Sequence, residues 1–187
     1  KQSIVAHGVR NSVGFGWHPT SGELWFTDNG RDHLGDDLPD DELNRLTRTG
    51  QHFGFPYIHA GDVPDPELYD GQPYTAYQSP ALKLGAHVAP LGLTFYIGNS
   101  FPDTDNDNLF IAEHGSWNRS SKVGYRVIKV DTATTPPTQE VFIEGWLQGE
   151  KAWGRPADII VDRDGSLLIS DDKAGAIYRV TYNPFRQ

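Results

Sequence analysis

The sequence has no cysteine in its 187 residues. This absence excludes disulfides, thiolate-bound metals and cysteine nucleophiles, and it leaves the cellular compartment open. Basic charge is scarce too, because 16 Lys and Arg face 25 Asp and Glu, for a formal net charge of −9. A general nucleic-acid-binding protein needs a basic face, so we expect no nucleic-acid partner.

Long apolar runs are also missing. No stretch approaches the roughly 20 apolar residues of a membrane-spanning helix, so the sequence predicts no membrane span. No signal peptide precedes the first strand-like segment, residues 1–9. We therefore expect either a trimmed precursor or a piece of a longer chain, and we favour the piece. The Ser-His-Asp arrangement, the phosphate-binding Gly-rich loop and the dinucleotide fingerprint are absent as well.

Helical periodicity is rare, whereas short strand-like runs are common. Hydrophobic residues make up 37% of the chain and aromatic residues 12%, with 20 Gly and 13 Pro scattered among them. Runs such as ELWFTDNG, NLFIAEHG, YRVIKVD and SLLISDD are rich in β-branched and aromatic residues and are bounded by turn residues. Many short strands at regular spacing predict an all-β sandwich, barrel or propeller.

An internal repeat favours the propeller. Segments that start at Arg10, His87 and Arg155 each carry a basic residue, a short apolar strand, a turn, and a second strand ending in an acidic or Gly-containing corner. Such a unit is typical of propeller blades. We expect a single, partial β-propeller domain over residues 1–187 with about three four-stranded blades, where a closed ring has about four to eight.

Two segments fall outside this repeat. Residues 1–9 would be the outer strand of a blade whose beginning is missing. Residues 45–83 contain five Pro and are expected to be mostly loop. A loop of that length in a compact domain is either functional or a lid.

Arg10 and Asn11 lie just before the first inner strand of the repeat. The starts of inner strands line the central channel of a propeller, where these side chains could donate several hydrogen bonds to a planar polyanionic ligand. The alternative is a strand-end pair that caps backbone carbonyls. Spacing alone leaves both interpretations open.

Gly30 and Arg31 follow the next strand. Gly permits backbone conformations that turn carbonyl oxygens outward, and Ca²⁺ takes about six to eight oxygen ligands. An acidic segment, residues 36–42, lies just beyond. For most of its carboxylates a solvated loop is the favoured interpretation, and Glu42, next to the apolar Leu43, is the best metal candidate among them.

The segment from Glu113 to Arg119, EHGSWNR, combines an imidazole, an indole, an amide and a guanidinium. That mixture suits a stacked, anionic aromatic ligand better than a core, and a surface turn is the alternative. His59 and His87 could each be a base, a ligand or a packed polar residue, and for a single His packing is the usual outcome. The acidic turn at 103–108 imitates only the opening of an EF-hand loop, so we expect no calcium there.

The sequence resembles the glucose/sorbosone dehydrogenases, six-bladed propeller quinoproteins that use pyrroloquinoline quinone (PQQ) and calcium. The segments that carry the resemblance are RNSVGFGWHPTSGELWFTDNGRDHLGDDLPDDELN, HFGFPYIHAGD, GAHVAPLGLTFY, FIAEHGSWNRS and WGRPADIIVDRDGSLLISDDKAGAIYRVTY. The most similar members are the L-sorbosone dehydrogenase-like proteins and the pyranose dehydrogenases. The resemblance covers almost the whole chain and corresponds to the C-terminal half of such an enzyme, with a periplasmic or extracellular location implied.

The resemblance implies roles for individual residues around the cofactor. Arg10 and Asn11 match the pair that contacts the quinone, with Arg10 near the reactive carbonyl as the catalytic residue of this chain. Arg155 matches a basic residue on the far side of the site. The cofactor-wall motif matches His114, Trp117, Asn118 and Arg119.

The resemblance also implies metal ligands. Gly30 and Arg31 match the step whose main-chain oxygens hold the cofactor calcium. Glu42 falls where a structural calcium ligand lies in the glucose branch, and Asp62 could join it. The general-base His of the family comes from earlier blades, and none of the seven His residues here can be assigned that role.

The implied reaction is oxidation of a sugar or aldehyde, with hydride transfer to PQQ assisted by calcium and reoxidation by an external electron acceptor. Two alternatives remain open. One is a non-catalytic half-propeller that binds or assembles with another chain, and the other is a calcium-dependent lactonase-type propeller. Because a partial ring has exposed strand edges, we also expect self-association or pairing with the missing blades.

Overall fold

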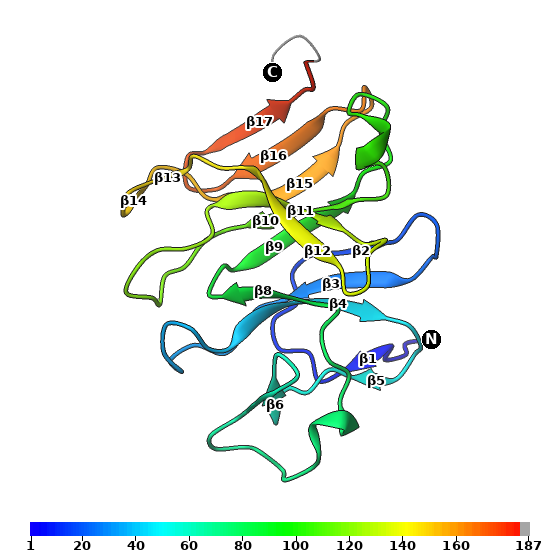
Figure 1. The fold of residues 1–187 in the computed structure, drawn as a ribbon, viewed down its shortest axis with the longest axis vertical. Helices are drawn as coiled ribbons and strands as arrows, with labels where there is room; N and C mark the ends of the chain where they lie inside the picture. The colour runs from blue at the N-terminus through cyan, green and yellow to red at the C-terminus, as the bar shows by residue number, and fades with distance from the viewer. Residues whose placement is uncertain (184–187) are drawn as a thin grey trace.

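The computed structural model describes residues 1–183 and consists almost entirely of β-strands (Figure 1). Two short 3₁₀ helices, η1 (Tyr74–Ala76) and η2 (Asp103–Asp105), are the helical elements within those residues. Neither is long or apolar enough to cross a membrane. The predicted all-β class is confirmed.

Three antiparallel sheets follow one another along the chain as propeller blades, and Figure 1 shows them stacked from bottom to top. Blade one contains β2 (Phe15–Trp17), β3 (Leu24–Asp28), β4 (Asp40–Leu46) and β8 (Leu82–Ala86). Blade two contains β9 (Pro90–Phe95), β10 (Leu109–Glu113), β11 (Arg126–Asp131) and β12 (Thr138–Ile143). Blade three contains β15 (Pro156–Val161), β16 (Leu167–Asp171) and β17 (Ala176–Val180), one strand fewer than predicted within the described residues.

The core lies between neighbouring blades, because β3 of blade one and β10 of blade two bury both of their faces. Every residue of β10 is buried. Trp25 and Leu43 of blade one pack with Ile111 of blade two. On the other face of blade two, Phe110 packs with Ile159 of blade three. Apolar residues on both faces of a strand stabilise such face-to-face packing of sheets.

The inner strands β2, β9 and β15 contact one another in turn and line a shared groove of about 380 Å³. Gly92 of β9 lies against β15 so closely that a Cβ atom there would come within 2.6 Å of the Asp158 Cα atom. Only glycine allows this approach. The three sheets therefore converge on one axis, as in a propeller.

The segment between β4 and β8 is mostly loop, as predicted. It contains three two-residue strands, β5 (Gln51–His52), β6 (Ile58–His59) and β7 (Val63–Pro64). Residues 1–9 differ from the prediction of an outer strand, because they form only β1 (Ala6–His7), which pairs in parallel with β5. The start of the chain is therefore attached to this insertion, at the bottom of Figure 1. A last hairpin, β13 (Leu147–Gln148) and β14 (Lys151–Ala152), precedes blade three.

Candidate functional site

The segments that were predicted to carry function lie at one end of the three blades. In an antiparallel hairpin, the residues before the first strand and after the second strand share one edge. At that edge lie Arg10 and Asn11 before β2, Gly30 after β3, His87 before β9, His114 after β10 and Arg155 before β15.

A cavity of about 90 Å³ at this edge, called here the strand-end cavity, brings blade one and blade two together. It is lined by Arg10, Asn11, Asn29, Gly30, Asp32, Asp41, His87, Ala89 and Trp117. Four predicted site residues therefore share one cavity, namely Arg10, Asn11, Gly30 and Trp117. His114, Arg119 and Arg155 do not line it.

The buried carboxylate of Asp28 fixes the backbone of the Arg10–Asn11 pair. Its oxygens accept hydrogen bonds from the Arg10 N–H at 2.9 Å and the Asn11 N–H at 2.6 Å. Burial raises the pKa of Asp28, and the two backbone bonds oppose that shift. The Arg10 guanidinium donates to the Asn29 carbonyl at 3.1 Å and lies 3.4 Å from the Asp32 carboxylate. Arg10 thus caps a backbone carbonyl and also lines the cavity.

Asp41 connects the Gly30 step to blade two. One oxygen accepts from the Gly30 N–H at 2.7 Å and the other from the Ala89 N–H at 2.8 Å. Burial raises the pKa of Asp41 to about 6. A Cβ atom at Gly30 would lie 3.1 Å from Pro39 and 3.2 Å from the Asp40 carbonyl, so glycine fits this tight step best.

The carbonyl oxygens of Gly30 and Arg31 accept no hydrogen bond from any donor within residues 1–183. The Arg31 side chain turns away from the cavity and pairs with Asp65, which also bonds the His59 ring at 2.9 Å. His59 is therefore a packed polar residue. Free carbonyl oxygens are suitable Ca²⁺ ligands, although no group of three or more acidic or His side chains is arranged for a metal in the described part of the chain.

His114 and Arg155 form a second cluster at the same edge. Arg155 Nε donates to the His114 carbonyl at 2.9 Å, and its backbone N–H donates to Asp171 at 2.9 Å. The His114 ring lies 2.8 Å from Asp172, whose pKa is lowered by that contact. The His114 N–H also donates to the carbonyl of Ala89, a residue of the strand-end cavity, at 2.9 Å. Hydrogen bonds therefore link the two clusters.

The loop that follows His114 packs against the acidic segment of blade one. Trp117 is 67% exposed, and its ring meets the His33 ring edge-on at 5.8 Å. Arg119 pairs with Asp37 at 3.0 Å, and Asn118 lies between Trp117 and Arg119 on the chain. Part of the acidic segment thus holds this loop rather than standing free in solvent.

The prediction that the acidic segment 36–42 is a solvated loop is wrong for its last three acidic residues. Asp40, Asp41 and Glu42 belong to the strand β4. Glu42 is buried and accepts from the Ala60 N–H at 2.7 Å and the Asn44 amide at 2.8 Å. Burial raises its pKa to about 7. Asp62, the other suggested ligand of a structural calcium, pairs with Lys83 at 2.6 Å. A cation would have to replace these partners, so that site stays a prediction.

Sequence reasoning missed the carboxylates that support the site. Asp28 and Asp171 are both the last residue of the second strand of a blade, so alignment of the repeats could have identified them. Asp41 has no such signal, because its partners come from two distant segments.

The chain is similar to known proteins over almost its whole length. A family model described as TrAA12-like matches residues 2–183. An uncharacterized protein of Borreliella burgdorferi is 49% identical over 187 residues, which cover 97% of this chain and 49% of that protein. A PQQ-dependent sugar dehydrogenase of Hypocrea jecorina is 24% identical over 213 residues, covering 94% of this chain and 48% of the relative. The chain therefore spans about half the length of the curated relatives it matches.

Among solved structures, a calcium structure of a family AA12 carbohydrate-active enzyme of Trichoderma reesei superposes with a TM-score of 0.72. Its sequence is 25% identical, and the match covers 92% of this chain and 52% of that one. The arrangement of the three blades is thus the arrangement found in about half of that enzyme.

Proposed function

Because the chain belongs to the TrAA12-like family, related to PQQ-dependent sugar dehydrogenases, we propose that it supplies the cofactor-binding half of such an enzyme. The substrate would be a sugar or an aldehyde of the aldose or sorbosone type, and an external acceptor would reoxidise the quinone. The observation that carries the proposal is the strand-end cavity, where Arg10, Asn11, Gly30 and Trp117 meet.

PQQ is a flat tricarboxylate of three fused rings, so it would lie across the mouth of this small cavity. Arg10 and Asn11 would donate hydrogen bonds to it, and the exposed Trp117 ring is free to stack on it. Arg155 and His114 would face its far side. Arg119 and Asn118, also predicted as cofactor contacts, would need the loop at 116–121 to shift toward the cavity, since Arg119 now pairs with Asp37.

The residues present also fit a calcium ion next to the quinone, because the carbonyl oxygens of Gly30 and Arg31 are unused. Asp41 would hold the Gly30 step rigid, and Asp32 would add negative charge nearby. When held by Arg10, Asn11 and the Gly30 and Arg31 carbonyls, PQQ and calcium would supply the hydride-accepting chemistry. The Arg10 guanidinium would stabilise negative charge that develops on an oxygen at the cavity mouth. The proton acceptor would come from outside these residues.

The half-ring also needs a partner in this proposal. Phe15 and Trp17 of the inner strand β2 are 67% and 68% exposed, and Ile177 of β17 is 73% exposed. Exposed apolar side chains on unpaired sheets favour association. We propose pairing with further blades or with a second copy, in a periplasmic or extracellular setting. Light scattering that gives a single monomeric mass would contradict the association.

Activity tests the proposal against its alternatives. The purified protein would be incubated with PQQ and Ca²⁺, and dye reduction would be followed with aldoses and with lactones. Because the proton acceptor would come from outside these residues, the dehydrogenase half predicts PQQ binding by this chain and aldose-dependent dye reduction once the missing blades are added. PQQ binding without turnover even after that addition would favour the non-catalytic half-propeller, and lactone hydrolysis without PQQ would favour the lactonase-type propeller.

A further inference from the structure

A second cavity is lined by other residues of the loop at 116–125 and shares no lining residue with the strand-end cavity. It has a volume of about 540 Å³ and lies between β8, the outer strand of blade one, and β11 of blade two. We call it the inter-blade cavity. Its apolar wall is formed by Leu84, Val88 and Leu147. A cavity of several hundred Å³ with an apolar wall and a few polar groups is suited to a small organic molecule.

Arg126 supplies the first polar group. Its Nε donates to Glu113 at 2.6 Å, and Glu113 is completely buried. This bond holds the guanidinium in place, while both terminal nitrogens of Arg126 make no hydrogen bond within residues 1–183. The unused donors therefore belong to a fixed, pre-oriented side chain.

Arg119 supplies the second polar group. One terminal nitrogen donates to Asp37 at 3.0 Å. Its Nε atom is buried and has no partner among the described residues. The buried Nε atom leaves no room for a ligand atom, so the donor that Arg119 can offer to the cavity is its other terminal nitrogen, which makes no hydrogen bond within residues 1–183.

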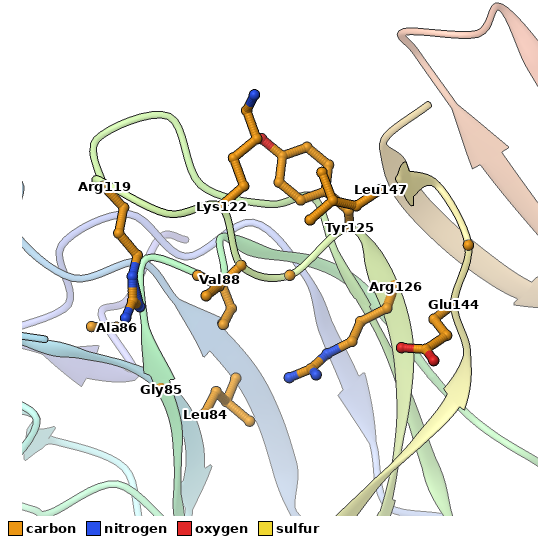
Figure 2. A pocket seen from close by; sticks show the side chains of 13 residues that line it. Leu84, Gly85, Ala86, Val88, Arg119, Lys122, Tyr125, Arg126, Glu144 and Leu147 are labelled. Atoms are coloured by element: carbon orange, nitrogen blue, oxygen red, sulfur yellow. The ribbon is translucent and has the colours of Figure 1, made fainter. Parts of the chain in front are cut away.

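Figure 2 shows where these groups lie. The Arg126 guanidinium extends toward Leu84 and the Arg119 guanidinium lies beside Ala86, whereas the Lys122 amino group points away. Lys122 is in addition bonded to the Glu150 carbonyl. Two guanidinium forks above an aliphatic surface are complementary to a carboxylate on an apolar body.

We propose that the inter-blade cavity binds a small organic carboxylate, whose anionic end lies between Arg119 and Arg126 and whose apolar body covers Leu84 and Val88. With the loop at 116–121 in its present position, this cavity shares no lining residue with the strand-end cavity. The one carboxylate of its lining is Glu144, which is exposed. Glu144 limits the number of negative charges that the ligand can carry.

Calorimetric titration with benzoate tests the proposal. Its neutral isostere benzamide and inorganic phosphate, an anion without an apolar body, are the comparison probes. We expect saturable binding of benzoate, and binding of benzamide and of phosphate that is at least about tenfold weaker. Arg119→Gln should weaken benzoate binding by about tenfold. Arg10→Gln, in the strand-end cavity, is the matched control and should leave benzoate binding unchanged.

A change at Glu113 tests whether Arg126 binds the ligand, as distinct from its ion pair with Glu113. Glu113→Gln keeps Arg126 but removes its buried counter-charge, so benzoate should bind more tightly to this variant. Benzoate binding does not require PQQ, so this experiment tests the inter-blade cavity independently of the proposed function. Absence of benzoate binding, equal binding of benzamide or phosphate, or unchanged affinity in both the Arg119 and Glu113 variants would overturn the proposal.

Discussion

Asp171 holds the backbone of Arg155 in blade three as Asp28 holds that of Arg10 in blade one. Each carboxylate ends the second strand of its blade and accepts the backbone N–H of the arginine before the first strand, in both cases at 2.9 Å. The same hydrogen bond therefore positions both arginines, and it recurs at the equivalent place in the two blades.

Asp28→Asn should loosen the Arg10 step. An amide NH₂ would replace one of the two acceptor oxygens and face a backbone N–H, so we expect a loss of about 1–3 kcal/mol in the free energy of unfolding. PQQ affinity should fall as well, by about tenfold, because Arg10 is displaced. Urea unfolding and PQQ titration measure the two effects.

A matched control is Asp131→Asn, which changes a half-buried carboxylate at the other end of a blade, where it bonds only the Ala133 N–H. It should leave PQQ affinity unchanged. If Asp28→Asn bound PQQ as well as the wild type, Asp28 would have no role in positioning Arg10.

Glu42 should make stability depend on pH. Its pKa is about 7 in the folded protein against 4.5 for an ordinary Glu. The folded state therefore keeps a proton that the unfolded chain releases, and this contribution to stability is lost as the pH rises from about 4.5 to 7. Glu42→Gln should remove this dependence, which amounts to at most about 3 kcal/mol.

The Gln variant fits the site, because the Asn44 Oδ1 atom is buried and has no partner. Rotation of the Asn44 amide would let that oxygen accept from Gln, or from protonated Glu42. Thermal unfolding of the wild type and Glu42→Gln between about pH 5 and 8 measures the pH dependence of stability. Asp41 and Glu113, whose pKa values are also raised, are present in both proteins, so the difference between the two curves belongs to Glu42. Glu140→Gln, at an exposed position, should follow the wild type, and parallel curves for Glu42→Gln and the wild type would refute the prediction.

Gly92→Ala should separate the inner strands of blades two and three. The added methyl group would collide with the Asp158 backbone, and a rigid strand cannot yield without losing its packing. We expect a loss of more than about 2 kcal/mol in the free energy of unfolding. Gly16→Ala is the control, because its Cβ atom would meet side chains and no backbone, namely Leu93 at 3.1 Å and Phe95 at 3.7 Å. Equal stability of the two variants would contradict the close approach of β9 and β15.

The sequence pattern predicted the blades because their signals are local. β3, β10 and β16 are apolar, β-branched or aromatic runs bounded by turn residues, and their repetition along the chain reveals the propeller. The pattern failed for β4, whose residues DDELNRL look like a solvated segment. Long-range bonds from the backbone amides of Gly30, Ala89 and Ala60 bury its carboxylates, and no local pattern contains that information.

The candidate site was predictable in part for the same reason. Arg10, Asn11 and Gly30 lie at repeated positions, and the structure places them together. The sequence predicted that the whole motif from His114 to Arg119 lines one ligand site. Alternate residues of a loop, however, point to different sides. Trp117 consequently lines the strand-end cavity while Arg119 lines the inter-blade cavity.

Calorimetric titration of PQQ with and without Ca²⁺, on the wild type and Arg10→Gln, tests the central claim most directly. Binding of PQQ to the wild type should depend on Ca²⁺, be abolished by a chelator, and weaken by at least about tenfold in Arg10→Gln, because the charge-assisted hydrogen bonds of the guanidinium are lost. PQQ affinity that is the same in both proteins, or indifferent to Ca²⁺, would contradict the assignment of this edge of the blades as a quinone site.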